Sequence, residues 1–156
     1  TKTEIGLIAK NAGLWPSIIG GLIGGIWMLK IGINRALWIF GVVQLVSIVG
    51  FAILTYFPQN KVALGLAISF EAVGVGLGTA AFVAFIARTT NPAYTATQFA
   101  LFTSLAALPR TVINSFAGVI VESIGWLNFY WLCMLLAVPG MLLLFKVAPW
   151  NEKKPE

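Results

Sequence analysis

The sequence predicts an all-α membrane protein, a polytopic bundle of about five transmembrane helices. Of its 156 residues, 59% are apolar and only 10% are charged, so a water-facing surface around an ordinary soluble core would be hard to build. Apolar runs of about 18 or more residues, long enough to cross a bilayer, recur along the chain. Short joints rich in Pro, Gly, Asn and charge separate these runs, as expected where helices end.

Five runs of about 20 to 26 residues fit this length, because a helix rises about 1.5 Å per residue. The joints "KIGINR", "PQNK", "RTTNPAY" and "ESIGW" separate one run from the next. We expect one transmembrane domain over residues 1–149 and a cytoplasmic tail, "WNEKKPE", over residues 150–156. The predicted spans are, in chain order, residues 5–29, 36–57, 62–87, 97–121 and 127–148.

Small residues mark the first and third spans. Glycines recur there at four-residue spacing, which predicts faces for close helix packing, with sliding of one helix against another as the alternative. These glycines are Gly20, Gly21, Gly24 and Gly25 in the first span and Gly74 and Gly78 in the third.

The fourth and fifth spans carry other signals. Pro109 in the fourth predicts a bend, because proline removes one backbone hydrogen bond and crowds the preceding turn. The stretch "WLNFYWL" opens the fifth and contains Trp126, Tyr130 and Trp131. Aromatic residues at the end of a span are typical of a membrane interface.

Basic residues predict the orientation. If the first span runs from outside to inside, six Lys and Arg lie on the cytoplasmic side and two lie outside, which the positive-inside rule favours. The six are Lys30, Arg35, Arg88, Lys146, Lys153 and Lys154, and the two are Lys2 and Lys61. We therefore expect an external N-terminus and a cytoplasmic C-terminus.

Composition excludes several function classes. The chain has no His, no Asp and a single cysteine, Cys133, so it cannot assemble a metal site, a Ser-His-Asp triad or a Cys-His pair by itself. We therefore expect no catalytic residue and no enzyme. The ten Lys and Arg residues are scattered singly, without the basic face that nucleic acid binding requires.

Arg110 is the most informative polar residue. It lies near the middle of the fourth span, about 20 Å from either end, and charges at that depth usually face a protein interior or a water-filled cavity. Glu122 is about three turns away, too far to be a local partner. We predict that Arg110 lines a substrate or proton path. A structural pair with another group is the alternative.

Glu71 also lies deep in its span, the third, about 15 Å beyond Lys61. A carboxyl group with little access to water favours its protonated form, so Glu71 is predicted to carry a coupling proton or to pair with Arg110. Lys10 and Asn11 lie near the outer end of the first span, where Lys can also extend to the interface. Weaker candidates, which interhelical hydrogen bonding explains equally well, are Gln44, Ser104 and Asn114.

Several stretches resemble a known family. "GLIGGIWMLKIGINRALWIFG" resembles the cytoplasmic loop signature of the major facilitator superfamily, carried here by Gly25, Lys30, Gly32 and Arg35. "TEIGLIAKNAGL", "SFEAVGVGLGTAAFVAFIA", "TATQFALFTSLAALPR" and "GWLNFYWLCMLLAVPGMLLL" together resemble the C-terminal half of the AmpG-type muropeptide permeases of bacteria. One departure is Leu29, which stands before Lys30 where the loop signature usually has an acidic residue.

The resemblance implies both fold and function. It implies twelve helices in two lobes, with these spans as helices eight to twelve of the C-terminal lobe, so a preceding N-terminal lobe is an expected partner. It also implies proton-driven import of anionic anhydromuramyl peptides across the bacterial inner membrane, for peptidoglycan recycling and β-lactamase induction. No cofactor beyond the proton gradient is implied.

The family's polar stretches match this chain at individual positions. Those positions are Lys10 and Asn11 in the first span, Glu71 in the third, and Gln98 and Arg110 in the fourth. We expect Arg110, Lys10, Asn11 and Asn114 to bind substrate and Glu71 to couple the proton. Two alternatives stay open: an acetyl-CoA transporter of the same wider group, and a membrane subunit that transports nothing itself.

Overall fold

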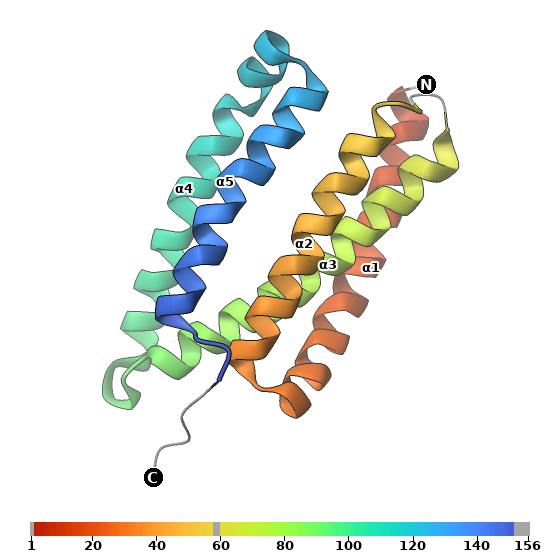
Figure 1. The fold of residues 1–156 in the computed structure, drawn as a ribbon. Coiled ribbons are helices and arrows are strands. Elements are labelled where there is room, and N and C mark those ends of the chain that lie inside the picture. Colours follow the sequence, from red (N-terminus) through yellow and green to blue (C-terminus); the bar gives the residue numbers. More distant parts are fainter. Residues whose placement is uncertain (1, 58–59, 152–156) are drawn as a thin grey trace.

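Five long helices make up the computed structural model, which describes residues 2–57 and 60–151 (Figure 1). Each is long and apolar enough to cross a membrane. They are α1 (Lys2–Ile31), α2 (Ile33–Leu54), α3 (Lys61–Thr89), α4 (Thr95–Ile124) and α5 (Trp126–Val147), with a short 3₁₀ turn, η1 (Pro92–Tyr94), before α4. The predicted all-α membrane bundle is confirmed.

The helices differ from the predicted spans mainly at their ends. The predicted second span runs to residue 57, but α2 ends at Leu54, because the next amide groups bond three residues back and close a tight turn through Phe57. The first, third and fourth helices extend beyond their apolar runs into polar residues. Residues 58 and 59 of the "PQNK" joint and residues 152–156 of the predicted tail lie outside the described residues.

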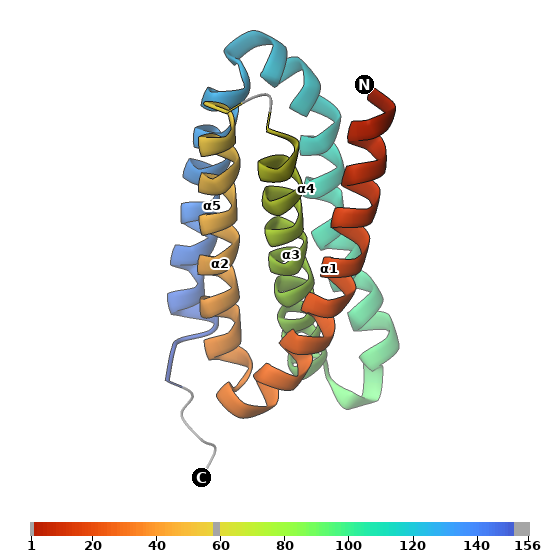
Figure 2. The ribbon, with the colours of Figure 1, turned by 90° about the vertical axis from the view of Figure 1, so that its right-hand side faces the viewer.

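Successive helices alternate in direction. Figure 1 shows the first residues of α1, α3 and α5 and the last residues of α2 and α4 at one end of the bundle, here named the N-terminal end. The last residues of α1, α3 and α5 and the first residues of α2 and α4 lie at the opposite, C-terminal end. Helices α1, α2 and α3 form one group, and α4 and α5 form a hairpin beside it, as Figure 2 shows from a second side.

Glycines bring α1 and α3 into close contact. A Cβ added at Gly20 would lie 2.5 Å from the backbone oxygen of Val73, and one added at Gly76 would overlap the backbone oxygen of Ser17. Gly24 meets the Cα of Leu77 in the same way, at 3.1 Å from an added Cβ. These positions need glycine because the two backbones touch there, which supports a packing role for the first-span glycines.

The best-packed region lies toward the C-terminal end, between α1, α2 and α3. Its buried side chains are Ala36, Phe40, Leu77 and Ala81. By contrast, α4 and α5 have no buried residue within the described chain. The hairpin therefore rests against the three-helix group along a loosely filled boundary, and two cavities open there.

Candidate functional site

A cavity of about 710 Å³ opens between α2, α3 and α4. Thr103, Ala106, Ala107 and Arg110 share one face of α4, because residues three, four and seven apart lie along one side of a helix. Their small side chains leave room in front of the guanidinium. We call this space the Arg110 cavity; its walls are Gln44 from α2, Val75, Gly78, Thr79 and Phe82 from α3, and the four α4 residues.

Arg110 stands in this cavity without a partner. Among the described residues, no hydrogen bond or ion pair is formed by its guanidinium. Pro109 lies inside a continuous helix from Thr95 to Ile124 and leaves the Leu105 carbonyl without its usual intrahelical donor. The site thus offers a cation, one amide from Gln44 and the Thr79 hydroxyl, which suits binding of an anion with hydrogen-bonding groups. The Thr103 hydroxyl can only accept there, because it donates to the Phe99 carbonyl of its own helix at 2.8 Å.

Glu71 lies on α3 outside the cavity wall and is half-buried. Glu71 and Arg110 are both described, and they form no ion pair with each other in this structure. One reason is their depth: Gly78, which lines the cavity, is two turns or about 10 Å beyond Glu71 along α3.

The other predicted substrate residues do not reach the cavity. Lys10, Asn11 and Asn114 are exposed, and none of them lines it. The amide of Asn11 donates to the Leu7 carbonyl of its own helix at 3.2 Å. Asn114 lies one turn past Arg110 on the same side of α4. The structure therefore brings Arg110 together with Gln44, not with the residues that the sequence grouped with it.

Gln98 has a local structural role. Its side-chain oxygen accepts the backbone N–H of Asn91 at 2.7 Å and so closes the connection between α3 and α4. Sequence reasoning missed Thr79 and Thr103 as cavity residues. The spacing of seven residues from Thr103 to Arg110 was an available signal, since it places both on one helix face.

The predicted cytoplasmic loop forms the turn between α1 and α2. Gly32 takes a positive φ of 86°, a conformation that favours glycine. The guanidinium of Arg35 lies 5.8 Å from the ring centre of Trp150. Lys30 is exposed, and an added Cβ at Gly25 would meet nothing within 4 Å. Of the four loop residues, Gly32 and Arg35 thus have a visible structural role.

Asn34, which the sequence did not single out, holds this end together. Its amide nitrogen donates to the Pro149 carbonyl at 3.0 Å, and its oxygen accepts a hydrogen bond from Arg88. The indole of Trp38 donates to the Ala148 carbonyl at 2.9 Å. We call these contacts the C-terminal clasp. The neutral amide of Asn34 thus joins the start of α2 to the end of α3 and to the segment that follows α5.

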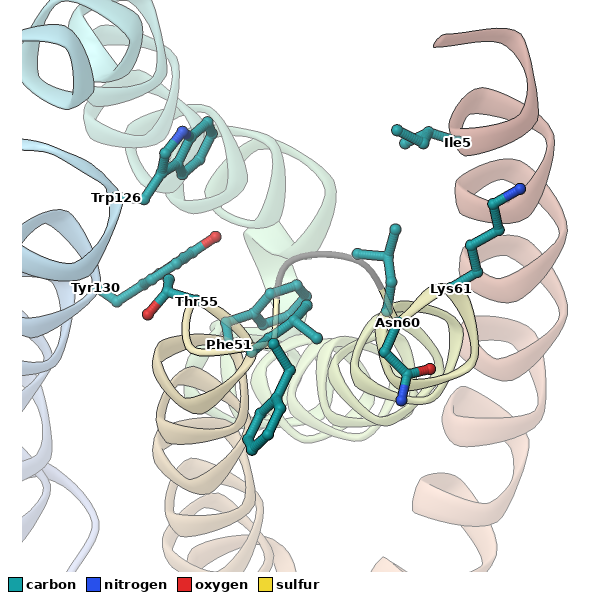
Figure 3. Close-up of a pocket in the computed structure, with 10 residues that line it drawn as sticks. Ile5, Phe51, Thr55, Asn60, Lys61, Trp126 and Tyr130 are labelled. Atoms are coloured by element: carbon teal, nitrogen blue, oxygen red, sulfur yellow. The ribbon is translucent and has the colours of Figure 1, made fainter. Parts of the chain in front are cut away.

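A second cavity, of about 540 Å³, lies at the N-terminal end (Figure 3). Trp126 and Tyr130 of the predicted aromatic belt line it, together with Phe51 and Phe57, whereas Trp131 does not. Lys61 at its rim forms an ion pair with Glu4, with 2.9 Å between nitrogen and oxygen. We call it the N-terminal pocket; the remaining lining residues are Ile5, Leu54, Thr55, Asn60 and Leu64.

No family model matches the chain, but single proteins do. An anhydromuropeptide permease of Escherichia coli is 40% identical over 90% of the chain. The chain is similar to the AmpG-type permeases. A Rickettsia conorii protein that carries the name AmpG 4 is 35% identical over 92% of the chain, and an uncharacterized Haemophilus influenzae protein is 52% identical over 98%.

These matches confirm the resemblance to the AmpG-type permeases and cover almost the whole chain. The chain spans only about a third of its relatives, namely 29% of the E. coli permease, 35% of the R. conorii protein and 38% of the H. influenzae protein. Together with the five apolar helices, the relationship makes this a multi-pass membrane protein. Its named relatives are permeases or transporters, which are not enzymes.

Proposed function

We propose that this chain is part of a proton-coupled transporter that imports anhydromuramyl peptides across the bacterial cytoplasmic membrane. The observation that carries the proposal is the unpaired Arg110 guanidinium in a 710 Å³ cavity halfway along the helices. Kinship with an anhydromuropeptide permease supplies the substrate class. Such sugar-peptides are anionic because their peptide part ends in carboxylates.

Arg110 meets a substrate carboxylate in this proposal. A guanidinium presents two parallel N–H groups that fit the two oxygens of a carboxylate, a pairing stronger and more directional than a lysine contact. Gln44, Thr79 and Thr103 add hydrogen-bonding groups along the same wall. A volume of this size lies within the range of small-molecule sites.

Glu71 carries the coupling proton. It is half-buried on α3, and the described part of the chain gives it no cation to neutralise it. A carboxyl group in that position can change its protonation state as the path to either side of the membrane opens. No cofactor is needed, because the proton gradient drives import.

The rest of the assembly follows from the same proposal. The chain forms most of the C-terminal lobe of a major facilitator fold and works with an N-terminal lobe across a substrate path between them. The N-terminal end of the bundle faces outward and the C-terminal end faces the cytoplasm, as the basic residues favour. Import then serves peptidoglycan recycling and, in bacteria that have it, β-lactamase induction.

Two alternatives are less well supported. Acetyl-CoA is also anionic and would suit Arg110, but the named relatives point to muropeptides. A subunit that transports nothing would leave the unpaired Arg110 without a purpose at a depth where charges are costly.

Uptake measurements test the proposal. The full natural gene is expressed in cells that lack their own muropeptide permease. Uptake of labelled anhydromuropeptide is then compared with uptake of labelled acetyl-CoA. Accumulation of the anhydromuropeptide that stops when the proton gradient is dissipated supports the proposal. Uptake of acetyl-CoA alone, or of neither compound, contradicts it.

A further inference from the structure

Gln44 reaches from α2 onto the backbone of α3 at a single glycine. Gly74 is buried, and a Cβ added there would lie 3.1 Å from the side-chain oxygen Oε1 of Gln44 and 3.8 Å from its amide carbon Cδ. Only a glycine lets the side chain lie this close to the helix without displacing it. The half-buried Gln44 side chain is therefore held between two helices.

The same contact sets the direction of the amide group. Because Oε1 is closer than Cδ to the added Cβ, the Gln44 carbonyl is directed at Gly74. The amide nitrogen Nε2 lies farther from that position than Cδ does. Within the described part of the chain, the side chain of Gln44 forms no hydrogen bond. Hydrogen bonding between helices, the alternative role expected for Gln44, is thus not seen there, and its N–H groups are free.

Open space lies next to this amide. Gly78, one turn beyond Gly74 on α3, lines the Arg110 cavity, and an added Cβ there would meet nothing within 4 Å. Gln44 lines the cavity from α2 and Arg110 lines it from α4, where Ala106 and Ala107 keep the wall low. One ligand in the cavity can therefore contact both the guanidinium and the amide.

The two groups together suit a particular chemical pattern. A carboxylate bound to Arg110 would fix one end of the ligand. At the end of a peptide, only the α carbon and the amide nitrogen separate the carboxylate from the preceding amide carbonyl. That carbonyl is an acceptor, and Gln44 has two N–H donors to offer it. A ligand without the carbonyl would leave these donors unpaired, which a polar site penalises.

We propose that Gln44 makes the Arg110 cavity specific for N-acylated amino acids, because its Nε2 donates to the amide carbonyl next to the carboxylate that Arg110 binds. Gly74 positions this donor. The proposal rests on the substrate role of Arg110 in the transporter proposed above and names the chemical feature that the same site selects.

The first test uses two small probes that differ in the amide alone. N-acetylalanine has a carboxylate and an amide; 2-methylpentanoate has the same length and carboxylate but no amide. Each probe displaces labelled anhydromuropeptide from the purified protein, expressed from its full natural gene. Gln44→Met, which keeps an unbranched side chain, should weaken N-acetylalanine roughly 2- to 10-fold, the range for one neutral hydrogen bond, and leave 2-methylpentanoate unchanged. Arg110→Ala should weaken both probes alike.

The matched control is Val46→Met, on the same helix at a 52% exposed position that does not line the cavity. It should match the parent with both probes. The amount of folded protein is measured for every variant by fluorescence-detected gel filtration, so that a loss of binding is not confused with a loss of folded protein.

A second test asks whether Gly74 positions the donor. Gly74→Ala adds the Cβ that pushes against Oε1, so it should weaken N-acetylalanine in the parent but cause no further loss in Gln44→Met. Gly50→Ala, on α2 with open space around its added Cβ and outside the cavity wall, is the control. Equal losses from Gly74→Ala in the two backgrounds would show that Gly74 does not act through Gln44.

The outcomes separate this proposal from the one it rests on. If Gln44→Met weakens both probes equally, or neither, Gln44 does not recognise the amide and the proposal is wrong. The substrate role of Arg110 still stands in that case, provided that Arg110→Ala weakens both probes. If Arg110→Ala changes neither probe, or the parent binds no anhydromuropeptide, the proposed function fails and the specificity of Gln44 fails with it.

Discussion

Replacing Arg110 by alanine should abolish most uptake without harming the fold. Its guanidinium has no partner among the described residues, so its loss leaves no buried carboxylate unpaired. If it grips a substrate carboxylate, the lost charged hydrogen bonds are worth about 1.5 to 3 kcal/mol each, or roughly a 10- to 150-fold loss of binding per bond. Arg110→Lys should recover little, because an ammonium group lacks the planar fork.

The assay is uptake of labelled anhydromuropeptide per folded molecule, with the amount of folded protein measured by fluorescence-detected gel filtration. Val112→Ala, two residues along α4 and outside the cavity wall, is the control and should match the parent. Parental uptake in Arg110→Ala would refute the substrate role. A low amount of folded Arg110→Ala that Glu71→Gln restores would show instead that the two residues form a buried pair.

Four further predictions follow from the same contacts. Glu71→Gln should abolish gradient-driven uptake but keep substrate exchange; equal loss of both would remove its coupling role. Gly20→Ala should lower the unfolding temperature, because overpacking against α3 lowers the free energy of unfolding by about 1 to 3 kcal/mol. Gly25→Ala should leave the unfolding temperature unchanged, because the space around its added Cβ is open. Asn34→Ala should lower the free energy of unfolding by about 1 to 3 kcal/mol, because the Pro149 carbonyl and Arg88 lose this amide as a hydrogen-bond partner. An unchanged midpoint in a thermal unfolding assay would show that the C-terminal clasp does not stabilise the fold. A cysteine at Asn60 should react with an impermeant reagent added outside the cell, and reaction only from inside would invert the proposed orientation.

The sequence was sufficient to predict five long helices and the position of a residue along each of them. Helix length and the position of a residue along it depend only on residue count, because every residue adds the same rise. Glycine spacing likewise predicted a face for close packing on the first span, and Gly20 and Gly24 do meet the α3 backbone. Gly25 and Gly78 have the same pattern but meet nothing within 4 Å of an added Cβ. Small residues therefore mark where packing is possible, not which neighbour fills it.

The direction in which a side chain points was harder to predict. Arg110 and Glu71 were correctly placed inside their helices, yet whether they meet depends on how α3 and α4 are rotated about their own axes, which residue count does not fix. For α3 that rotation is set by contacts between residues far apart in the chain, such as the close approach of Gly76 to the Ser17 backbone of α1 and the hydrogen bond from Arg88 to Asn34. The result is two ionisable groups with different surroundings: Arg110 beside amide and hydroxyl groups in a cavity, and Glu71 half-buried outside that cavity's wall. Arg110 and Glu71 form no ion pair with each other in this structure. In the proposed transporter a substrate carboxylate and a proton would therefore each have a separate site, which a buried Arg110–Glu71 pair would prevent.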